Sequence, residues 1–167
     1  MNKEQTISAA AAGTFTIGGD LTVNRMGYGA MRITGQGVWG PPADKAASLA
    51  TLRHAIELGV NLIDTADSYG PGTSEELIAE ALHPYPAGLV IATKGGWERP
   101  GPGQWTHNAS PKHLAEALEG SLKRLRLDRI DVYQLHAPDY AVSFEASVEA
   151  LARLREQVRF VMSRSRM

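Results

Sequence analysis

Short apolar runs alternate with amphipathic helical patterns along most of this chain, and this alternation constrains the fold more than any other feature. Each apolar run has the length of a buried strand, and each helical pattern places its apolar residues on one face. Because a pair of parallel strands needs a crossover connection, the alternation predicts βαβ units and an α/β fold. Strands are predicted over residues 60–64, 88–93 and 130–136, and helices over 45–58, 74–82, 111–127 and 143–157.

Two α/β architectures accommodate this alternation. One is an open, doubly wound sheet, and the other is a (β/α)8 TIM barrel, which needs eight βα units and typically about 250 residues. The 167 residues supply the first four βα units and a fifth strand, predicted at 158–162, so length alone favours the open sheet. A barrel built from this chain would be a partial one.

The sequence before the first helix predicts a β-hairpin and a further strand. A Gly-Gly-Asp turn separates two β-prone runs at 14–23, and glycine pairs favour hairpin turns. Residues 24–33 are predicted as one strand. For the domain organisation we expect a disordered segment at 1–13, a single domain at 14–162 and a tail at 163–167.

Capping residues set the predicted starts of the helices. Asp44 is predicted to cap the first helix, and Ser110, followed by Pro111, to start the third. Ser74 is predicted to open the second helix. The stretch at 94–108, rich in glycine and proline, is predicted as a long irregular loop.

One glycine loop suggests a nucleotide-binding alternative. Gly35-Gln-Gly37-Val-Trp-Gly40 matches the G-x-G-x-x-G pattern, and Asp64 lies about where a ribose-binding acid is expected. In that fingerprint the third glycine opens the helix, so that helix N–H groups meet the pyrophosphate. Here two prolines follow Gly40, which favours a flexible loop over the mouth of a site. A doubly wound nucleotide-binding module is the alternative reading.

Titratable residues end three successive predicted strands. Asp64 ends the first, Lys94 the second and His136 the third, and Tyr69 follows Asp64 in a loop. The carboxyl ends of parallel strands share one face, where barrel enzymes build their active sites. Taken singly, each residue has a plain structural role, such as a turn cap or a solvated charge. Their joint placement indicates a catalytic group.

These side chains can carry out acid–base chemistry on a carbonyl group. A tyrosine hydroxyl has a pKa of about 10, and the ammonium of Lys94, kept charged by a carboxylate, is expected to lower it. An imidazole beside the phenol can orient a carbonyl oxygen or relay a proton. No side chain donates hydride, so such a reaction needs a nicotinamide cofactor.

Composition and charge argue against several other classes of function. The net charge of -1 gives no field that attracts nucleic acid or a membrane, and no apolar stretch reaches membrane-spanning length. Without cysteine the chain has no disulfide or cysteine nucleophile. Asp64 and Asp67 lack a convergent histidine pair, so no metal site is predicted. We expect a small-molecule substrate and a cytoplasmic location.

At these residues the sequence resembles the aldo-keto reductase family. "GVNLIDTADSYGPGTSEELIAEAL" resembles its first signature block, "VIATKGG" its lysine-bearing strand, and "GSLKRLRLDRIDVYQLHAPD" its second block. The resemblance runs from about residue 14 to residue 157. It implies a (β/α)8 barrel preceded by an N-terminal β-hairpin, and reduction of aldehydes or ketones to alcohols with NADPH as the usual cofactor.

The resemblance also implies roles for individual residues. The implied catalytic tetrad is Asp64, Tyr69 as general acid, Lys94 and His136. The residues implied to lie near the nicotinamide end of the cofactor are Gly29, Ala30, Met31 and Asp64. The residues expected to line the pocket for a small-molecule carbonyl substrate are Trp39 and Trp97.

The C-terminal sequence departs from the family pattern. In the family the last of these helices leads into Gly-Lys and a strand that ends in Gly-x-Ser-Asn, whereas here Val158 directly follows Gln157. We therefore expect a truncated barrel that lacks most of the cofactor platform and has little or no activity alone. Unpaired sheet edges favour self-association. A non-catalytic fragment or a self-associating subunit is the alternative function.

Overall fold

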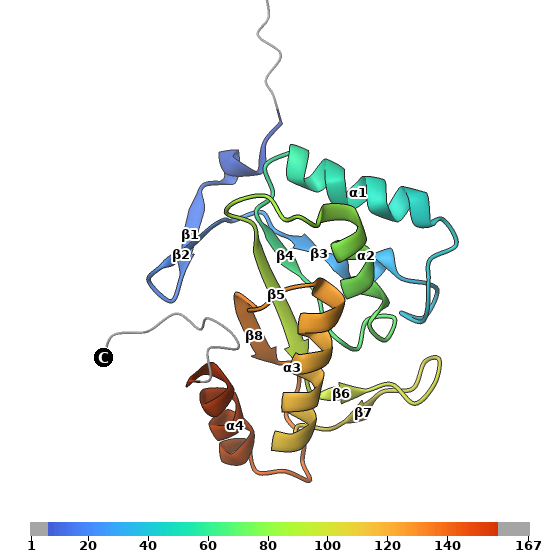
Figure 1. Cartoon of the computed structure of the whole chain (residues 1–167), viewed down its shortest axis with the longest axis vertical. Coiled ribbons are helices and arrows are strands. Elements are labelled where there is room, and N and C mark those ends of the chain that lie inside the picture. The colour runs from blue at the N-terminus through green and yellow to red at the C-terminus, as the bar shows by residue number, and fades with distance from the viewer. Residues whose placement is uncertain (1–6, 157–167) are drawn as a thin grey trace, which may run out of the picture.

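Strands and helices alternate through the computed structural model, which describes residues 7–156 (Figure 1). The helices are η1 (Ala9–Ala12), η2 (Ala30–Ile33), α1 (Lys45–Glu57), α2 (Thr73–Leu82), α3 (Pro111–Leu125) and α4 (Phe144–Glu156). The strands are β1 (Thr14–Ile17), β2 (Leu21–Asn24), β3 (Tyr28–Gly29), β4 (Leu62–Asp64), β5 (Val90–Gly95), β6 (Trp97–Glu98), β7 (Thr106–His107) and β8 (Val132–Leu135). The strand predicted at 158–162 and the tail at 163–167 lie outside the described residues.

Four strands form one parallel sheet in the order β3-β4-β5-β8. Each strand of this sheet therefore lies next to the strand that precedes or follows it in the sheet's sequence order. The register pairs Asp64 with Gly29 of β3 on one side and with Ala92 of β5 on the other. Sequential order with right-handed crossovers puts the connecting helices on one face, as in a barrel wall. A doubly wound sheet reverses its strand order, so the doubly wound alternative is wrong.

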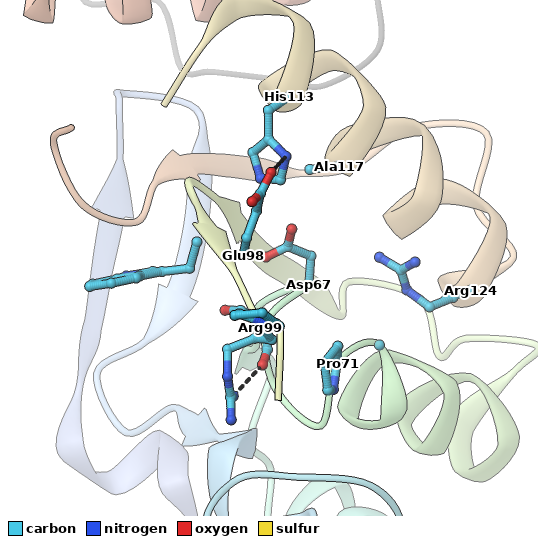
Figure 2. Close-up of a pocket in the computed structure, with 11 residues that line it drawn as sticks. Asp67, Pro71, Glu98, Arg99, His113, Ala117 and Arg124 are labelled. Atoms are coloured by element: carbon cyan, nitrogen blue, oxygen red, sulfur yellow. Dashed lines mark hydrogen bonds and ion pairs between the residues drawn. The ribbon is translucent and has the colours of Figure 1, made fainter. Parts of the chain in front are cut away.

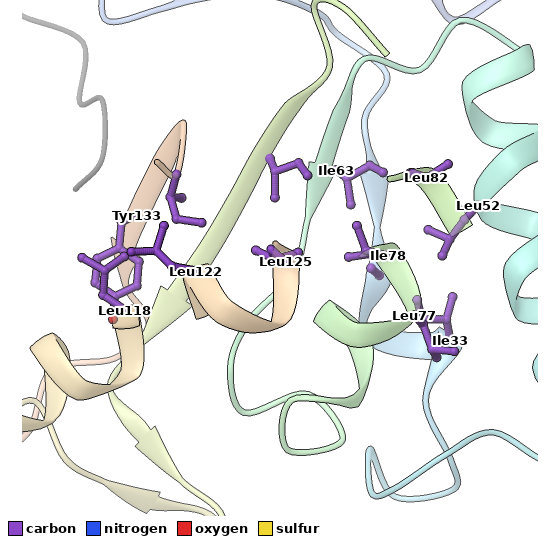
Figure 3. Close-up of a cluster of buried hydrophobic side chains, with 13 residues drawn as sticks. Ile33, Leu52, Ile63, Leu77, Ile78, Leu82, Leu118, Leu122, Leu125 and Tyr133 are labelled. Carbon is purple, nitrogen blue, oxygen red and sulfur yellow. The ribbon is translucent and has the colours of Figure 1, made fainter. Parts of the chain in front are cut away.

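The larger apolar core of the described residues lies between this sheet and helices α1, α2 and α3 (Figure 3). Leu52, Ile78 and Leu118 contribute from the helices, and Ile63 and Tyr133 from the sheet, each at most 2% exposed. Full burial of an aliphatic side chain of this size stabilises the fold by about 1.5–3 kcal/mol. The core thus fixes which face of each helix meets the sheet and, with it, where each strand ends.

Two of the three predicted helix starts are confirmed. Asp44 and Ser110 cap α1 and α3, accepting hydrogen bonds from first-turn backbone N–H groups at 2.8 and 3.3 Å. The start predicted at Ser74 is displaced by one residue, because α2 begins at Thr73 and Ser74 is fully buried in its first turn. Its hydroxyl donates to the Ala30 carbonyl at 3.0 Å. Ser74 therefore fastens the helix to the end of a strand.

The strand predicted at 24–33 is much shorter than expected. Only Tyr28–Gly29 joins the parallel sheet, and residues 30–33 turn into the 3-10 helix η2. Ala30 and Ile33 are buried in the core that α2 also contributes to. Packing against the helix thus overrides the β-propensity of this stretch, which is the weaker effect.

The stretch at 94–108 is more regular than the predicted loop. β5 continues to Gly95, and β6 pairs with β7 in a short antiparallel hairpin. This hairpin follows the carboxyl end of β5, whereas the β1–β2 hairpin, predicted correctly at 14–23, lies toward the opposite end of the sheet (Figure 1). The β6–β7 hairpin is therefore placed to cover the face on which the parallel strands end.

The N-terminal segment is partly ordered, contrary to the disorder expected at 1–13. Residues 9–12 form η1, and the buried Ala9 donates its N–H to the Leu58 carbonyl at 2.7 Å. This contact attaches the segment to the end of α1. In the part of the chain that the structure covers, no helix combines the length and the apolar character needed to cross a membrane.

Candidate active site

Lys94 and Asp64 form an ion pair where β5 and β4 end. The Lys94 Nζ lies 2.7 Å from Asp64 Oδ1 and 2.8 Å from Oδ2, and it also donates to the Thr65 carbonyl at 2.8 Å. The lysine side chain is 14% exposed and the aspartate 44%. The pair therefore joins two strand ends and opens to solvent on the aspartate side.

Tyr69 packs between this ion pair and His136. The Lys94 Nζ lies 5.4 Å from the centre of the phenol ring, and the imidazole centre lies 5.6 Å from it in an edge-on arrangement. Burial raises the pKa of Tyr69 above its ordinary value, and the Asp64 carboxylate raises it further. The net shift is upward, opposite to the lowering expected from Lys94, because burial and the Asp64 carboxylate outweigh the nearby ammonium. With an ordinary tyrosine pKa of about 10 the hydroxyl already keeps its proton at neutral pH, and the upward shift acts in the same direction.

His136, just beyond β8, is neutral at physiological pH. The pKa of His136 is lowered to about 4, mainly by burial and also by Lys94, whereas Asp64 acts in the opposite direction. Its Nδ1 lies 3.4 Å from the Ser68 Oγ. A neutral imidazole carries one N–H, which can be directed at a carbonyl oxygen. The structure thus brings Asp64, Tyr69, Lys94 and His136 into one group.

The three backbone positions expected to face the nicotinamide differ in access. Gly29 is exposed beside Asp64, and a Cβ added there would meet nothing within 4 Å, so a flat ring has open space. Met31 is half-buried. Ala30 is fully buried, with its carbonyl bound by Ser74. Gly29, Met31 and Asp64 therefore fit a cofactor ring, whereas Ala30 supports the strand end.

The two predicted pocket tryptophans lie on different loops near the tetrad. Trp97 meets His136 edge-on, with ring centres 6.4 Å apart. Trp39 forms a backbone β-bridge with Gly70, the residue that follows Tyr69. The Trp39 indole lies 5.5 Å from the Arg99 guanidinium. Both indoles can therefore border a substrate that reaches Tyr69.

Comparison with known proteins identifies the family. Residues 25–159 match the Aldo/keto reductase family. The chain belongs to this family. The predicted signature blocks and the partial barrel are thereby confirmed, since family members of known structure share this half of the fold.

The relatives are about twice as long as this chain. An uncharacterized oxidoreductase of Schizosaccharomyces pombe is 48% identical over 151 residues, covering 90% of this chain and 49% of the relative. Pyridoxine 4-dehydrogenase of Escherichia coli is 43% identical, covering 88% and 53%. The structure of a glycerol dehydrogenase from Gluconobacter oxydans superposes with a TM-score of 0.77 at 32% identity, covering 90% and 47%. The chain thus spans about half the length of these aldo-keto reductases.

This aldo-keto reductase chain has a pocket of about 450 Å³ (Figure 2) that no residue of the tetrad lines, although Ser68 and Trp97, which lie against His136, border it. Its lining includes Asp67, Trp97, His113 and Arg124. The pKa of Asp67 is raised to about 7, mainly by burial and also by the nearby Glu75, while Arg124 opposes the shift. Asp67 Oδ1 is buried without a hydrogen-bond partner among the described residues. Charging this carboxyl is therefore unfavourable in the folded chain.

Replacing Asp67 by asparagine is expected to stabilise the chain at high pH. Because the pKa of Asp67 is higher in the folded state than in the unfolded state, the folded state binds the proton more tightly. The stability of the native chain thus falls as pH rises from about 4 to about 7 and stays level above. Asp67→Asn should gain about 1–3 kcal/mol at pH 8.5, after allowance for partial solvent access, and little at pH 4. Urea unfolding at both pH values measures this; an equal effect at both would contradict it.

A buried polar network ties the first turn of α2 to the ends of the strands. Glu75, fully buried, accepts from Thr93 Oγ1 at 2.6 Å and from Arg124 Nε at 2.7 Å. In the same turn, Ser74 accepts from Thr65 Oγ1 at 2.8 Å. Thr93 directly precedes Lys94, and Thr65 directly follows Asp64. The network therefore holds in place the residues next to Asp64 and Lys94, and so helps to position their ion pair.

Sequence reasoning did not single out Ser68, Glu75 or Arg99. Ser68 and Glu75 lie inside the first signature block, so the block itself was the available signal. Glu75 falls in a helical pattern where an acid normally faces solvent. Arg99 lies in a stretch rich in proline and glycine and carries no pattern that predicts its contacts.

Proposed function

We propose that this chain carries the catalytic half of an NADPH-dependent oxidoreductase that reduces aldehydes or ketones to alcohols. The observation that supports the proposal is the convergence of a buried, protonated Tyr69 with the Lys94–Asp64 ion pair and a neutral His136. Family membership supports the same reaction class. A protonated phenol within reach of a cation and a neutral imidazole is suited to protonating a carbonyl oxygen.

In the proposed mechanism the chain's own residues handle the proton. The neutral imidazole of His136 directs its N–H at the carbonyl oxygen of the substrate and orients it. Tyr69 then donates its hydroxyl proton to that oxygen, and the Lys94 ammonium stabilises the phenolate that remains. Asp64 keeps Lys94 charged. A bound nicotinamide supplies the hydride that the carbonyl carbon accepts, so one hydride and one proton convert the carbonyl to an alcohol.

The finer assignments are part of the same proposal. Gly29, Met31 and Asp64 are proposed to hold the nicotinamide end, and Trp39 and Trp97 to border a small carbonyl substrate. NADPH is proposed as the preferred cofactor from the family resemblance. The preference needs a direct comparison with NADH, since one relative, from E. coli, is named an NADH-specific methylglyoxal reductase. A cytoplasmic location stays a prediction.

The 167-residue chain is expected to turn over little or no substrate alone. Its matched relatives are about twice as long, and the family resemblance implies that most of the cofactor platform lies in the later strands and loops. The test is NADPH oxidation by purified chain, folded by circular dichroism, with a test aldehyde. The expected rate equals the aldehyde-free background. Steady oxidation that Tyr69→Phe abolishes would contradict the expected inactivity and would support the chemistry.

Self-association is a second candidate property of the chain. Within residues 7–156, β3 and β8 are the edge strands of the parallel sheet. Beside β8 an apolar groove is lined by Leu135 and by Phe144 and Val148 of α4, which are 60% and 44% exposed. Edge strands next to apolar surface favour pairing with another chain. Sedimentation of the same sample over a range of concentrations distinguishes a dimer from a monomer.

A further inference from the structure

The guanidinium of Arg99 contacts three loops around the tetrad. Its Nη1 donates to the carbonyls of Val38 at 2.9 Å and Ser68 at 2.8 Å. Its Nη2 donates to the Gly37 carbonyl at 3.3 Å, and its Nε to that of Gln104 at 2.9 Å. These loops lie beyond β3, beyond β4 and between β6 and β7. One side chain therefore joins segments that are far apart in the sequence.

The same guanidinium lies against two indole rings. Its central carbon is 3.6 Å from the ring centre of Trp105 and 5.5 Å from that of Trp39. Arginine is suited to this position because its planar cation stacks on aromatic faces while its fork of N–H groups bonds in several directions. Burial in this setting lowers the pKa of Arg99. A lysine would supply the charge without the fork.

The loop that Arg99 holds includes a residue in a rare backbone conformation. Val38 has a φ of 56°, the left-handed region that a β-branched residue seldom adopts. Its carbonyl accepts from both Arg99 and the Gly70 N–H, the latter at 3.3 Å. Gly70 also accepts from the Gly40 N–H at 3.1 Å. The contacts of Arg99 thus help to keep this loop against the loop that carries Tyr69.

Ser68 connects this assembly to the tetrad. Its carbonyl is bound by Arg99, its Oγ lies 3.4 Å from His136 Nδ1, and the next residue is Tyr69. We infer that Arg99 is a positioning residue, which holds Ser68 in place and thereby fixes the orientation of the His136 imidazole. This role goes beyond the proposed reaction, and testing it needs neither cofactor nor substrate.

The contacts favour positioning over a role in binding an anionic substrate. All three guanidinium nitrogens of Arg99 already donate to backbone carbonyls. A substrate carboxylate that took the paired N–H groups in the usual bidentate manner would have to displace several of these bonds. Arg99 is therefore assigned to the protein scaffold around the site and not to the substrate.

The test is the titration of His136 in Arg99→Lys, followed by NMR of the imidazole carbon-bound protons. His136→Gln assigns the signal. Lys94 and Asp64, the charged groups that act on His136, are unchanged in the variant. If the loop moves away, water reaches the ring and its neutral form loses Ser68, so the pKa should rise from about 4 by about one unit or more. Acrylamide quenching of the tryptophans should also increase.

Arg129→Lys is the matched control, because Arg129 is exposed on a loop of the same domain. It should leave both measurements unchanged. An unchanged His136 titration in folded Arg99→Lys would overturn the inference, as would an equal change in the control. Should Arg99→Lys fail to fold, Ser68→Ala tests the same route, since it removes the hydroxyl and keeps the carbonyl that Arg99 binds. A His136 titration unchanged in Ser68→Ala would likewise overturn it.

Discussion

Tyr69→Phe is expected to lower kcat for aldehyde reduction by about 10²–10⁴ in a chimera that adds the half of the barrel that this chain does not span. The chimera joins residues 14–156 to the C-terminal half of the E. coli pyridoxine 4-dehydrogenase, which is 43% identical over the shared half. Phenylalanine keeps the ring that packs edge-on against His136 and loses only the hydroxyl. Because that hydroxyl is protonated at neutral pH, its loss removes the proton donor itself.

The control for this substitution is Tyr140→Phe. Tyr140 is 94% exposed and takes no part in the tetrad, so its variant should match the unmodified chimera. Rates are measured as aldehyde-dependent NADPH oxidation, and kcat is separated from KM, because loss of a proton donor acts mainly on kcat. A Tyr69→Phe rate within about twofold of the unmodified chimera would exclude Tyr69 as the general acid, since a proton donor contributes at least about 10².

Arg124→Met is expected to destabilise the chain by about 3–5 kcal/mol. The reason is the complete burial of Glu75, whose carboxylate would keep Thr93 but lose its cationic partner. Glu75→Gln should cost less, about 1–2 kcal/mol, because an amide oxygen can still accept from Thr93 and Arg124 is 27% exposed to solvent. The order of the two losses in stability is the sharper prediction: Arg124→Met, which leaves the buried charge of Glu75 unpaired, should destabilise the chain more than Glu75→Gln.

Urea unfolding of the chain measures both effects. Lys123→Met, an exposed neighbour of Arg124 on α3, controls for the loss of a positive charge near the helix end and should change stability by at most about 1 kcal/mol. If Arg124→Met costs no more than the control, the Glu75–Arg124 pair is not a buried support of the strand ends. A larger loss for Glu75→Gln than for Arg124→Met would also contradict the argument.

Periodicity and strand ends were predictable from the sequence because they depend on local pattern. The alternation of apolar strands and helices predicted the parallel sheet, and Asp64, Lys94 and His136 could be placed on one face because each ends a strand. Asp44 and Ser110 cap their helices as expected, since a cap is a contact within a few residues. Local rules of this kind need no knowledge of the tertiary fold.

Features that depend on tertiary packing were not predictable in the same way. The strand at 24–33 yields to a 3-10 helix because Ala30 and Ile33 are buried in the core. The direction of the pKa shift of Tyr69 depends on the balance between burial and the opposite charges of Asp64 and Lys94. These two residues form an ion pair with each other. Arg99 reaches carbonyls more than 60 residues earlier in the chain, which no local pattern encodes.

The steady-state rate of the unmodified chimera decides whether residues 14–156 contain a complete catalytic tetrad of an aldo-keto reductase. Aldehyde-dependent oxidation of NADPH is expected, because the tetrad comes from this chain and the rest of the protein comes from the E. coli relative. A chimera that is folded and binds NADPH saturably, yet oxidises none of it with any of a panel of aldehydes and ketones, would contradict the claim.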